Sequence, residues 1–171
     1  MKVRILNASD AKAYRELRLK GLKESPHAFG ESYEDECEKS LPEIAEELTP
    51  FGNPPEQFTL GAISEQGGLL GVVTFKRDTR SKARHKAMLY AMYVLPEARH
   101  HGVGQALLAE IVARARHIEG LEQIHLWVLH ASRSAADFYK QCGFEFQGPR
   151  IKGDLKISGE YVDAQYMVLR L

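Results

Sequence analysis

The sequence predicts an α/β (α+β) protein, in which a central mixed, mostly antiparallel sheet is flanked by helices. Three observations predict this class. A length of 171 residues suits one core. Apolar runs of strand length follow one another over residues 58–94, and an amphipathic helical pattern comes directly after them. Since helices interrupt a meander of strands, the sheet should be mixed. Because no repeat or linker divides the chain, we expect a single domain over residues 1–171.

The elements are predicted in the order βααβββαβαββ. Val3–Leu6 is a short apolar strand, and the helix that follows it ends before Pro26. Residues 31–48 are acidic but carry apolar residues at helical spacing toward their end. Pro42 suits the first turn of a helix, which would be the second of the chain.

The second half of the chain has the clearer patterns. Phe58–Ile63 and Leu69–Phe75 are predicted to form a hairpin, and Met88–Leu95 is the next strand. Val103–Ile118 shows one broad apolar stripe and is the clearest helix, which Gly120 ends. The remaining predicted elements are a strand at Gln123–Leu129, a helix at Ser134–Gln141, and strands at Phe144–Gln147 and Gln165–Leu171 separated by a polar loop at 148–164.

Composition excludes several classes of protein. Lys+Arg and Asp+Glu number 23 each, so no global charge favours nucleic acid or an anionic membrane as partner. No apolar run approaches the roughly 18 residues that a membrane span needs, and the first ten residues lack the apolar core of a signal peptide. Cys37 and Cys142 are far apart and are expected to be free thiols, which predicts a cytoplasmic protein. No metal-ligand spacing is present, so we expect no metal.

Residues 94–104 leave a predicted strand and enter the clearest helix. The N-terminus of a helix offers unpaired amides and a positive dipole end, which together bind anions. Gly102 and Gly104 remove side chains at this point, although on their own they also fit a simple tight turn. A Rossmann fingerprint needs a third small residue where Leu107 stands, and the chain contains no Walker A loop.

Two segments resemble motifs of the GCN5-related N-acetyltransferase (GNAT) superfamily. R-x-x-G-x-G at 99–104, after V-x-P at 94–96, is similar to motif A, which is [QR]-x-x-G-x-[GA] after a strand ending in V-x-P. A-x-x-F-Y-K-x-x-G-F at 135–144 is similar to motif B, and the distance between the two segments is usual for the family. The resemblance covers about residues 58–147.

The resemblance implies a GNAT fold with acetyl-CoA as co-substrate and a direct transfer of acetyl, in a ternary complex, to a primary amine of a small molecule or peptide. Tyr139 matches the tyrosine that protonates the departing thiolate. The backbone near Met92 would pair with pantetheine and polarise the thioester carbonyl. Ser132 stands where Asn is common. The implied cofactor-binding residues are Met92, Tyr93, Val94, Arg99, His100, His101, Gly102, Val103, Gly104, Gln105 and Ser132.

The sequence does not identify the general base, and several candidates remain. Trp127 stands where family members that acetylate protein N-termini carry Glu. Glu31, Glu34, Tyr90 or ordered water are the alternatives, and acidic residues over the acceptor site would favour a cationic amine. The acidic segment also fits a solvated helix face, and the basic stretch 76–86 is expected to be solvated.

A second function remains open as well. A CoA-binding sensor or interaction module could keep the same fold without catalysis. Tyr139 favours the enzyme, because a pure binder has no need of it. We expect no nucleic-acid or membrane partner. A homodimer is compatible with the resemblance, since dimers are common in the family.

Overall fold

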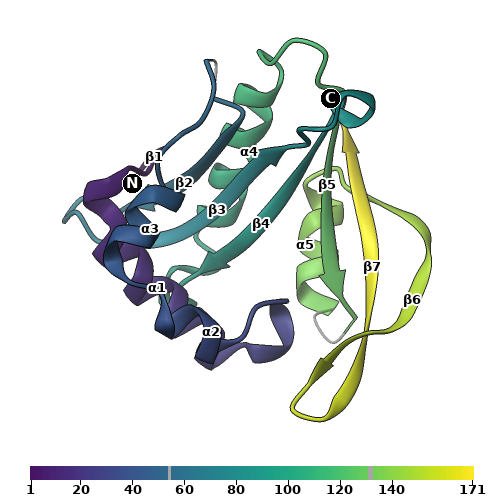
Figure 1. Ribbon diagram of the computed structural model, residues 1–171, viewed down its shortest axis with the longest axis horizontal. Helices are drawn as coiled ribbons and strands as arrows, with labels where there is room; N and C mark the ends of the chain where they lie inside the picture. Colours follow the sequence, from purple (N-terminus) through teal and green to yellow (C-terminus); the bar gives the residue numbers. More distant parts are fainter. Residues whose placement is uncertain (54, 131–132) are drawn as a thin grey trace.

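The computed structural model describes residues 1–53, 55–130 and 133–171. Its elements follow the order βαααβββαβαββ, with one short helix more than the sequence predicts (Figure 1). They are β1 (Lys2–Ile5), α1 (Ala11–Glu24), α2 (Tyr33–Glu38), α3 (Leu41–Glu47), β2 (Gln57–Ile63), β3 (Leu69–Arg77), β4 (Lys86–Val94), α4 (Val103–Ala115), β5 (Gln123–Leu129), α5 (Arg133–Gln141), β6 (Glu145–Ile157) and β7 (Glu160–Arg170).

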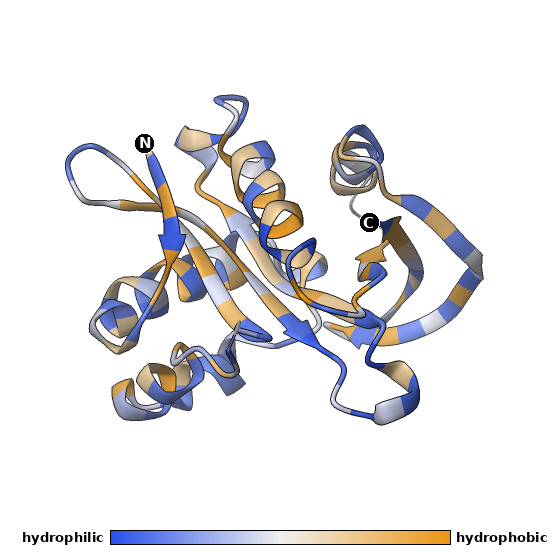
Figure 2. Cartoon of the chain, turned by 90° about the horizontal axis from the view of Figure 1, so that it is seen from above, coloured by the Kyte–Doolittle hydropathy of each residue, from blue (hydrophilic) through white to orange (hydrophobic). Residues whose placement is uncertain are grey.

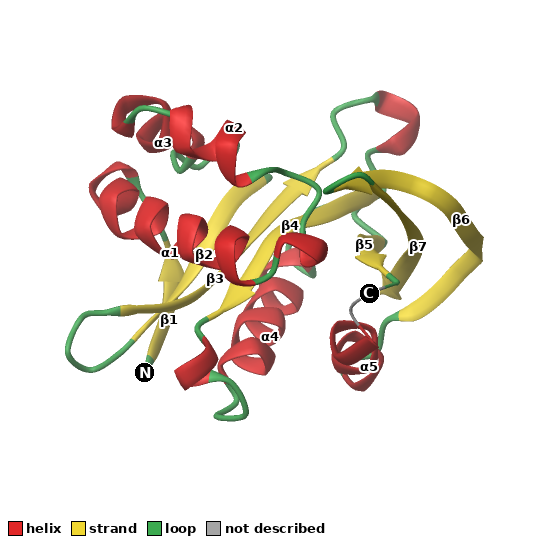
Figure 3. Cartoon of the chain, turned by 90° about the horizontal axis from the view of Figure 1, so that it is seen from below, coloured by secondary structure: helices red, strands yellow, loops and turns green. Residues whose placement is uncertain are grey.

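One seven-stranded sheet in the order β1-β2-β3-β4-β5-β7-β6 forms the centre of the molecule. β4 and β5 are parallel, and the other neighbouring strands are antiparallel. The predicted mixed, mostly antiparallel sheet is therefore confirmed. Helices α1, α2 and α3 cover one face, which we call the front, and α4 and α5 cover the other, the back (Figure 3).

Each face of the sheet has its own apolar core. The back core packs the stripe of α4, including fully buried Leu107 and Ile111, against Phe75 and Ile124 of the sheet. The front core is smaller and joins α1 and α3 to Val72. Burying a leucine or isoleucine side chain contributes about 2 kcal/mol, so the predicted apolar stripe anchors α4 against the sheet.

The acidic segment forms two short helices. The Ser32 side chain accepts from the amide of Asp35 and begins α2, and Ser40 begins α3 in a capping box with Glu43. Lys39 between them has an extended backbone (ψ 129°), which breaks the helical path. The helix predicted from Pro42 is thus α3, and α2 precedes it because a second serine caps a turn of its own.

The polar loop predicted at 148–164 is wrong, because these residues belong to the long hairpin of β6 and β7. Ser158 (φ 51°) and Gly159 (φ 89°) make its two-residue turn, as hairpins of this kind require. β6 lies at the edge of the sheet and is exposed along most of its length, and hydrophilic and hydrophobic residues alternate along it (Figure 2). Gly148, Pro149 and Gly153 interrupt this strand, and because such residues are typical of turns the sequence favours a loop here.

Arg77 also departs from expectation, because its side chain is buried and not solvated. The guanidinium donates to the carbonyls of Arg84 and of Glu119, the latter at 2.8 Å, and it pairs with Glu56. It therefore connects the end of β3 to the loop after α4.

Replacing this buried cation should destabilise the protein. We expect Arg77→Leu to lower the free energy of unfolding by about 2–3 kcal/mol, because it leaves two carbonyls and part of the Glu56 charge without donors. Arg80→Leu is the control, since that side chain is 80% exposed, and it should change stability by less than about 0.5 kcal/mol. Urea denaturation measures both. Equal midpoints for the two variants would contradict the structural role of Arg77.

Candidate active site

β4 and β5 pair over a short stretch and then diverge. Their register runs from Lys86↔Gln123 to Met88↔His125 and stops there. Beyond this point the two strands open into a V (Figure 1). Within the described ranges no strand pairs with the edge of β4 that faces β5 over residues 90–94. An extended ligand can add to such an edge through backbone hydrogen bonds.

A β-bulge lies on β4 beside the opening. Tyr90 pairs with Thr74 and Tyr93 with Val72, so Ala91 and Met92 stand opposite a single residue of β3. Ala91 has a positive φ of 52°, which an alanine rarely adopts. The extra residue brings both Tyr90 and Tyr93 to the front face, whereas Met92 packs with the back core.

The predicted anion site lies where the V is widest. Gly102 begins α4 with a φ of 77°, and the first bond of the helix runs from the amide of Ala106 to the Gly102 carbonyl at 2.9 Å. The amides of residues 103–105 precede that bond and point out of the helix end, as the first amides of an α-helix do. His100, which also has a positive φ (62°), and His101 are exposed beside them.

The two glycines of the turn differ in their surroundings. A Cβ on Gly102 would meet nothing within 4 Å, so this glycine serves its left-handed backbone. A Cβ on Gly104 would stand 2.9 Å from Cζ of Phe138 and 3.5 Å from Cε of Met92. Gly104 therefore packs directly against Phe138 of α5 and close to Met92 of β4, where there is no room for a larger side chain. A glycine at this position lets the N-terminus of α4 lie close to α5 and β4.

Arg99 lies against the strand that precedes it. Its Nε donates to the Val94 carbonyl at 3.0 Å, and its guanidinium lies 5.7 Å from the ring centre of Tyr93. These contacts hold the turn between β4 and α4 in shape. They also leave a positive charge close to the helix N-terminus.

Tyr139 lies on α5, on the back side of the V. Its ring packs edge-on against Phe144, with 5.7 Å between ring centres, and lies beside Phe138. Burial raises the pKa of the Tyr139 phenol well above its usual range, and Cys142 adds to this effect. The phenol therefore keeps its proton at neutral pH. Ser132, the other motif B position predicted to meet the cofactor, lies outside the described residues.

A cleft of about 540 Å³ lies on the front face of β4 and β5. The residues that line it come from the end of β3, from the turn after β3 and from the first half of β4, together with one residue each from β5, β6 and β7. Tyr90, His125 and Tyr166 form its aromatic part. The Trp127 ring, whose centre is 3.5 Å from that of Tyr166, extends this aromatic surface. Sequence reasoning missed the cleft, because its residues meet only through the pairing of strands.

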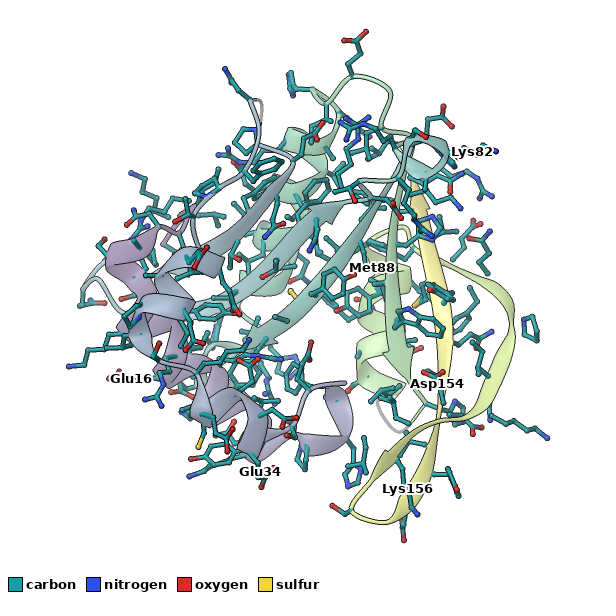
Figure 4. All side chains as sticks on the ribbon, in the orientation of Figure 1. Glu16, Glu34, Lys82, Met88, Asp154 and Lys156 are labelled. Atoms are coloured by element: carbon teal, nitrogen blue, oxygen red, sulfur yellow. The ribbon has the colours of Figure 1, made fainter. Side chains whose placement is uncertain are left out.

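The structure separates the candidates for the general base. Glu34 is exposed and lies on the outer side of α2 (Figure 4). Glu31 is bound to Arg18 at 2.8 Å. Tyr90 faces the cleft, but burial, Tyr166, Asp78 and Glu31 raise its pKa, so it is a phenol and not a base at neutral pH.

A sheet that opens beside a helix N-terminus, with a partly buried tyrosine on the next helix, fits the class of CoA-dependent acyltransferases. A model of the acetyltransferase (GNAT) family matches residues 20–144. The chain belongs to this acetyltransferase (GNAT) family. The fold of this family binds acetyl-CoA.

Three known proteins are similar to the chain. The L-amino acid N-acetyltransferase AaaT of Escherichia coli K12 is 32% identical over 101 residues, which span 59% of this chain and 61% of that enzyme. A phosphinothricin acetyltransferase from Sinorhizobium meliloti, solved with acetyl-CoA, is 26% identical with a TM-score of 0.82 over 99% of this chain and 88% of that chain. A GNAT acetyltransferase from Streptococcus pneumoniae shares the fold, with a TM-score of 0.85 and 21% identity over 99% of both chains.

Two further observations concern metals and membranes. The described residues contain no group of three or more His, Cys, Asp or Glu side chains that could hold a metal ion. Nor do they include a helix that is long and apolar enough to cross a bilayer.

Proposed function

We propose that this protein is an N-acetyltransferase that moves acetyl from acetyl-CoA to a primary amine of a small molecule or peptide by direct attack in a ternary complex. One observation carries the proposal. The diverging strands have Gly104 and Tyr139 on their back side and the 540 Å³ cleft on their front side. A thioester entering from the back and an amine entering from the front would meet beside the bulge at Ala91 and Met92.

The residues around the opening suit the parts of acetyl-CoA. The amides of residues 100–105 would hold the pyrophosphate, with Arg99, His100 and His101 supplying positive charge or donors nearby. The free edge of β4 at Met92, Tyr93 and Val94 would pair with the pantetheine arm. Ser132 would add a contact to a pantetheine amide.

The chemistry follows from these placements. Bound acetyl-CoA supplies an acetyl thioester. The backbone amide near Met92 donates a hydrogen bond to the carbonyl oxygen as charge builds on it. The amine nitrogen bonds to the carbonyl carbon while the carbon–sulfur bond breaks. Because the described carboxylates and Tyr90 offer no free base in the cleft, the acceptor's ammonium would lose one proton to solvent before it attacks. The nitrogen would lose its second proton as the amide forms. Tyr139 would give its phenolic proton to the sulfur and regain one from solvent.

The alternative is a CoA-binding sensor with the same fold. The partly buried, protonated Tyr139 beside the opening favours the enzyme, because binding alone has no need of a proton donor. We further propose a cytoplasmic location, since Cys37 and Cys142 are free thiols. A single domain over residues 1–171, and a homodimer, remain predictions.

Incubation of the protein with acetyl-CoA and a panel of amines, with detection of free CoA thiol, tests the proposal. We expect thiol release that depends on the amine, together with a stoichiometric N-acetyl product in mass spectra. Tight binding of CoA without turnover of any amine would favour the sensor instead.

A further inference from the structure

Building on the proposed function, we propose that the front cleft selects an amine that also carries an anionic group several bonds away from the nitrogen. Lys76 and Lys86 bind that group. This names the substrate class of the acceptor site: small amines with a remote carboxylate or phosphate.

The charges that line the cleft leave two ammonium groups available. Arg77 is engaged by Glu56, and Arg80 is engaged by Asp78 at 2.6 Å. Lys76 and Lys86 also line the cleft, and in the part of the chain that the structure describes neither pairs with a carboxylate. The cleft therefore has a net positive charge at the end where these lysines lie.

Strand register places both lysines on the front face. Lys76 stands opposite Met88, and Thr74 stands opposite Tyr90, so Lys76 and Tyr90 project to the same side. Lys86 lies two residues before Met88 on β4 and projects there too. Both lysines thus lie near the closed end of the V, where Figure 4 labels Met88.

The neighbouring titratable groups do not cancel this charge. Asp78 is held ionised by its hydrogen bond from Arg80, and Arg80 and Lys86 keep the pKa of Asp78 well below its usual value. Burial, with help from Lys86, lowers the pKa of His125, so this imidazole is neutral at pH 7. The single lining carboxylate is therefore already occupied, and an anionic ligand is free to approach the lysines.

The other end of the cleft, at Tyr90, carries no lining lysine. Glu31, the last of the groups that raise the pKa of Tyr90, pairs with Arg18. An amine would bind toward Tyr90 and its anionic partner toward the lysines. From the sequence alone the acidic segment fits either a solvated helix face or a role in favouring a cationic amine, and the lysines of the cleft add an anionic group to such an acceptor.

The distance between the amine and the anionic group of the acceptor can be estimated from the spacing of residues along β4. Lys76 stands opposite Met88, which precedes Ala91 by three residues and Met92 by four on β4. This separation is about 10–13 Å at 3.3 Å per residue. A lysine side chain that leans along the strand covers about half of this distance. The amine and the anion should then be roughly 5–7 Å apart. A cleft of about 540 Å³ has the size typical of small-ligand sites.

A series of acceptors tests the length and the charge. We compare glycine, 4-aminobutanoate and 6-aminohexanoate with butylamine, hexylamine and 1,6-diaminohexane, following thiol release. We expect kcat/KM for the longer amino acids to exceed that of the matched alkylamines about tenfold or more, and glycine to be poor. Aminoalkyl phosphates of the same lengths show whether the site prefers phosphate or carboxylate.

Variants assign the effect to the two lysines. Lys76→Met/Lys86→Met should lower kcat/KM for 6-aminohexanoate about tenfold or more, yet leave hexylamine within about twofold. Lys82→Met is the matched control, because Lys82 belongs to the same basic stretch, is exposed and does not line the cleft; Figure 4 labels it at the upper right. Lys76→Glu should turn the preference toward 1,6-diaminohexane.

Two results would overturn the anion site and leave the acetyltransferase intact. These are equal kcat/KM for charged and neutral amines, or an unchanged preference in the double variant. If no amine is acetylated, calorimetry with 6-aminohexanoate and the CoA-saturated protein decides. Binding that is lost in Lys76→Met/Lys86→Met supports the anion site although the proposed function fails. No binding to the parent protein overturns both.

Discussion

Tyr139→Phe is expected to lower kcat about 100-fold while the Kd for acetyl-CoA stays within about twofold. The substitution keeps the ring that packs against Phe144 and removes only the proton that the leaving sulfur needs. A loss in kcat without a loss in affinity is typical of an interaction made in the transition state. Single-turnover kinetics and equilibrium titration with acetyl-CoA measure the two quantities.

Another tyrosine provides the control. Tyr14 lies in the front core, on the opposite face of the sheet from Tyr139, and burial raises the pKa of its phenol too. Tyr14→Phe should leave kcat within about twofold. Equal kcat in Tyr139→Phe and the parent protein would refute the proton-donor role.

The same role predicts a pH dependence. An ordinary tyrosine loses its proton near pH 10, and burial raises the pKa of Tyr139 above this. The acid therefore stays protonated, and kcat should not fall as the pH rises from about 8 to 10. A decline with an apparent pKa near 9 would assign the proton to another group.

Gly104→Leu is expected to weaken acetyl-CoA binding at least about tenfold. The first atom of the new side chain would stand 2.9 Å from Phe138 and 3.5 Å from Met92, so the Phe138 ring or the start of α4 must shift. We expect the branched end to cover the amides at the helix N-terminus. Calorimetric titration with acetyl-CoA measures the loss, and thermal denaturation reports whether the fold persists.

A double variant separates cofactor binding from packing. Gly104→Leu/Phe138→Ala removes the ring that the leucine meets, and Phe138→Ala alone is its reference. We expect the double variant to regain stability and to bind acetyl-CoA weakly, because the leucine still covers the amides of α4. Full recovery of affinity would mean that Gly104 acts only through its contact with Phe138. Unchanged affinity in Gly104→Leu would contradict the proposed pyrophosphate site at the N-terminus of α4.

Much of the fold could be predicted because its signals are local. The stripe of α4, the hairpin of β2 and β3 and the turn at 94–104 each depend on residues that are neighbours in the sequence. Periodicity and backbone preference act over such distances. The wrong prediction at 148–164 has the complementary cause. β6 owes its structure to pairing with β7 at the sheet edge, and its own composition is that of a loop.

The same distinction between local and long-range contacts applies to the candidate site. Motif A and motif B are each contiguous in the sequence, so the sequence by itself determined the family. It also predicted the acetyl-CoA turn and the proton donor Tyr139 as candidates. Only the tertiary structure decided that Gly104 faces Phe138, that Arg77 is buried, and that Lys76 and Lys86 share the front cleft. These facts depend on a bulge and on strand register, where one residue more or less turns a side chain to the opposite face.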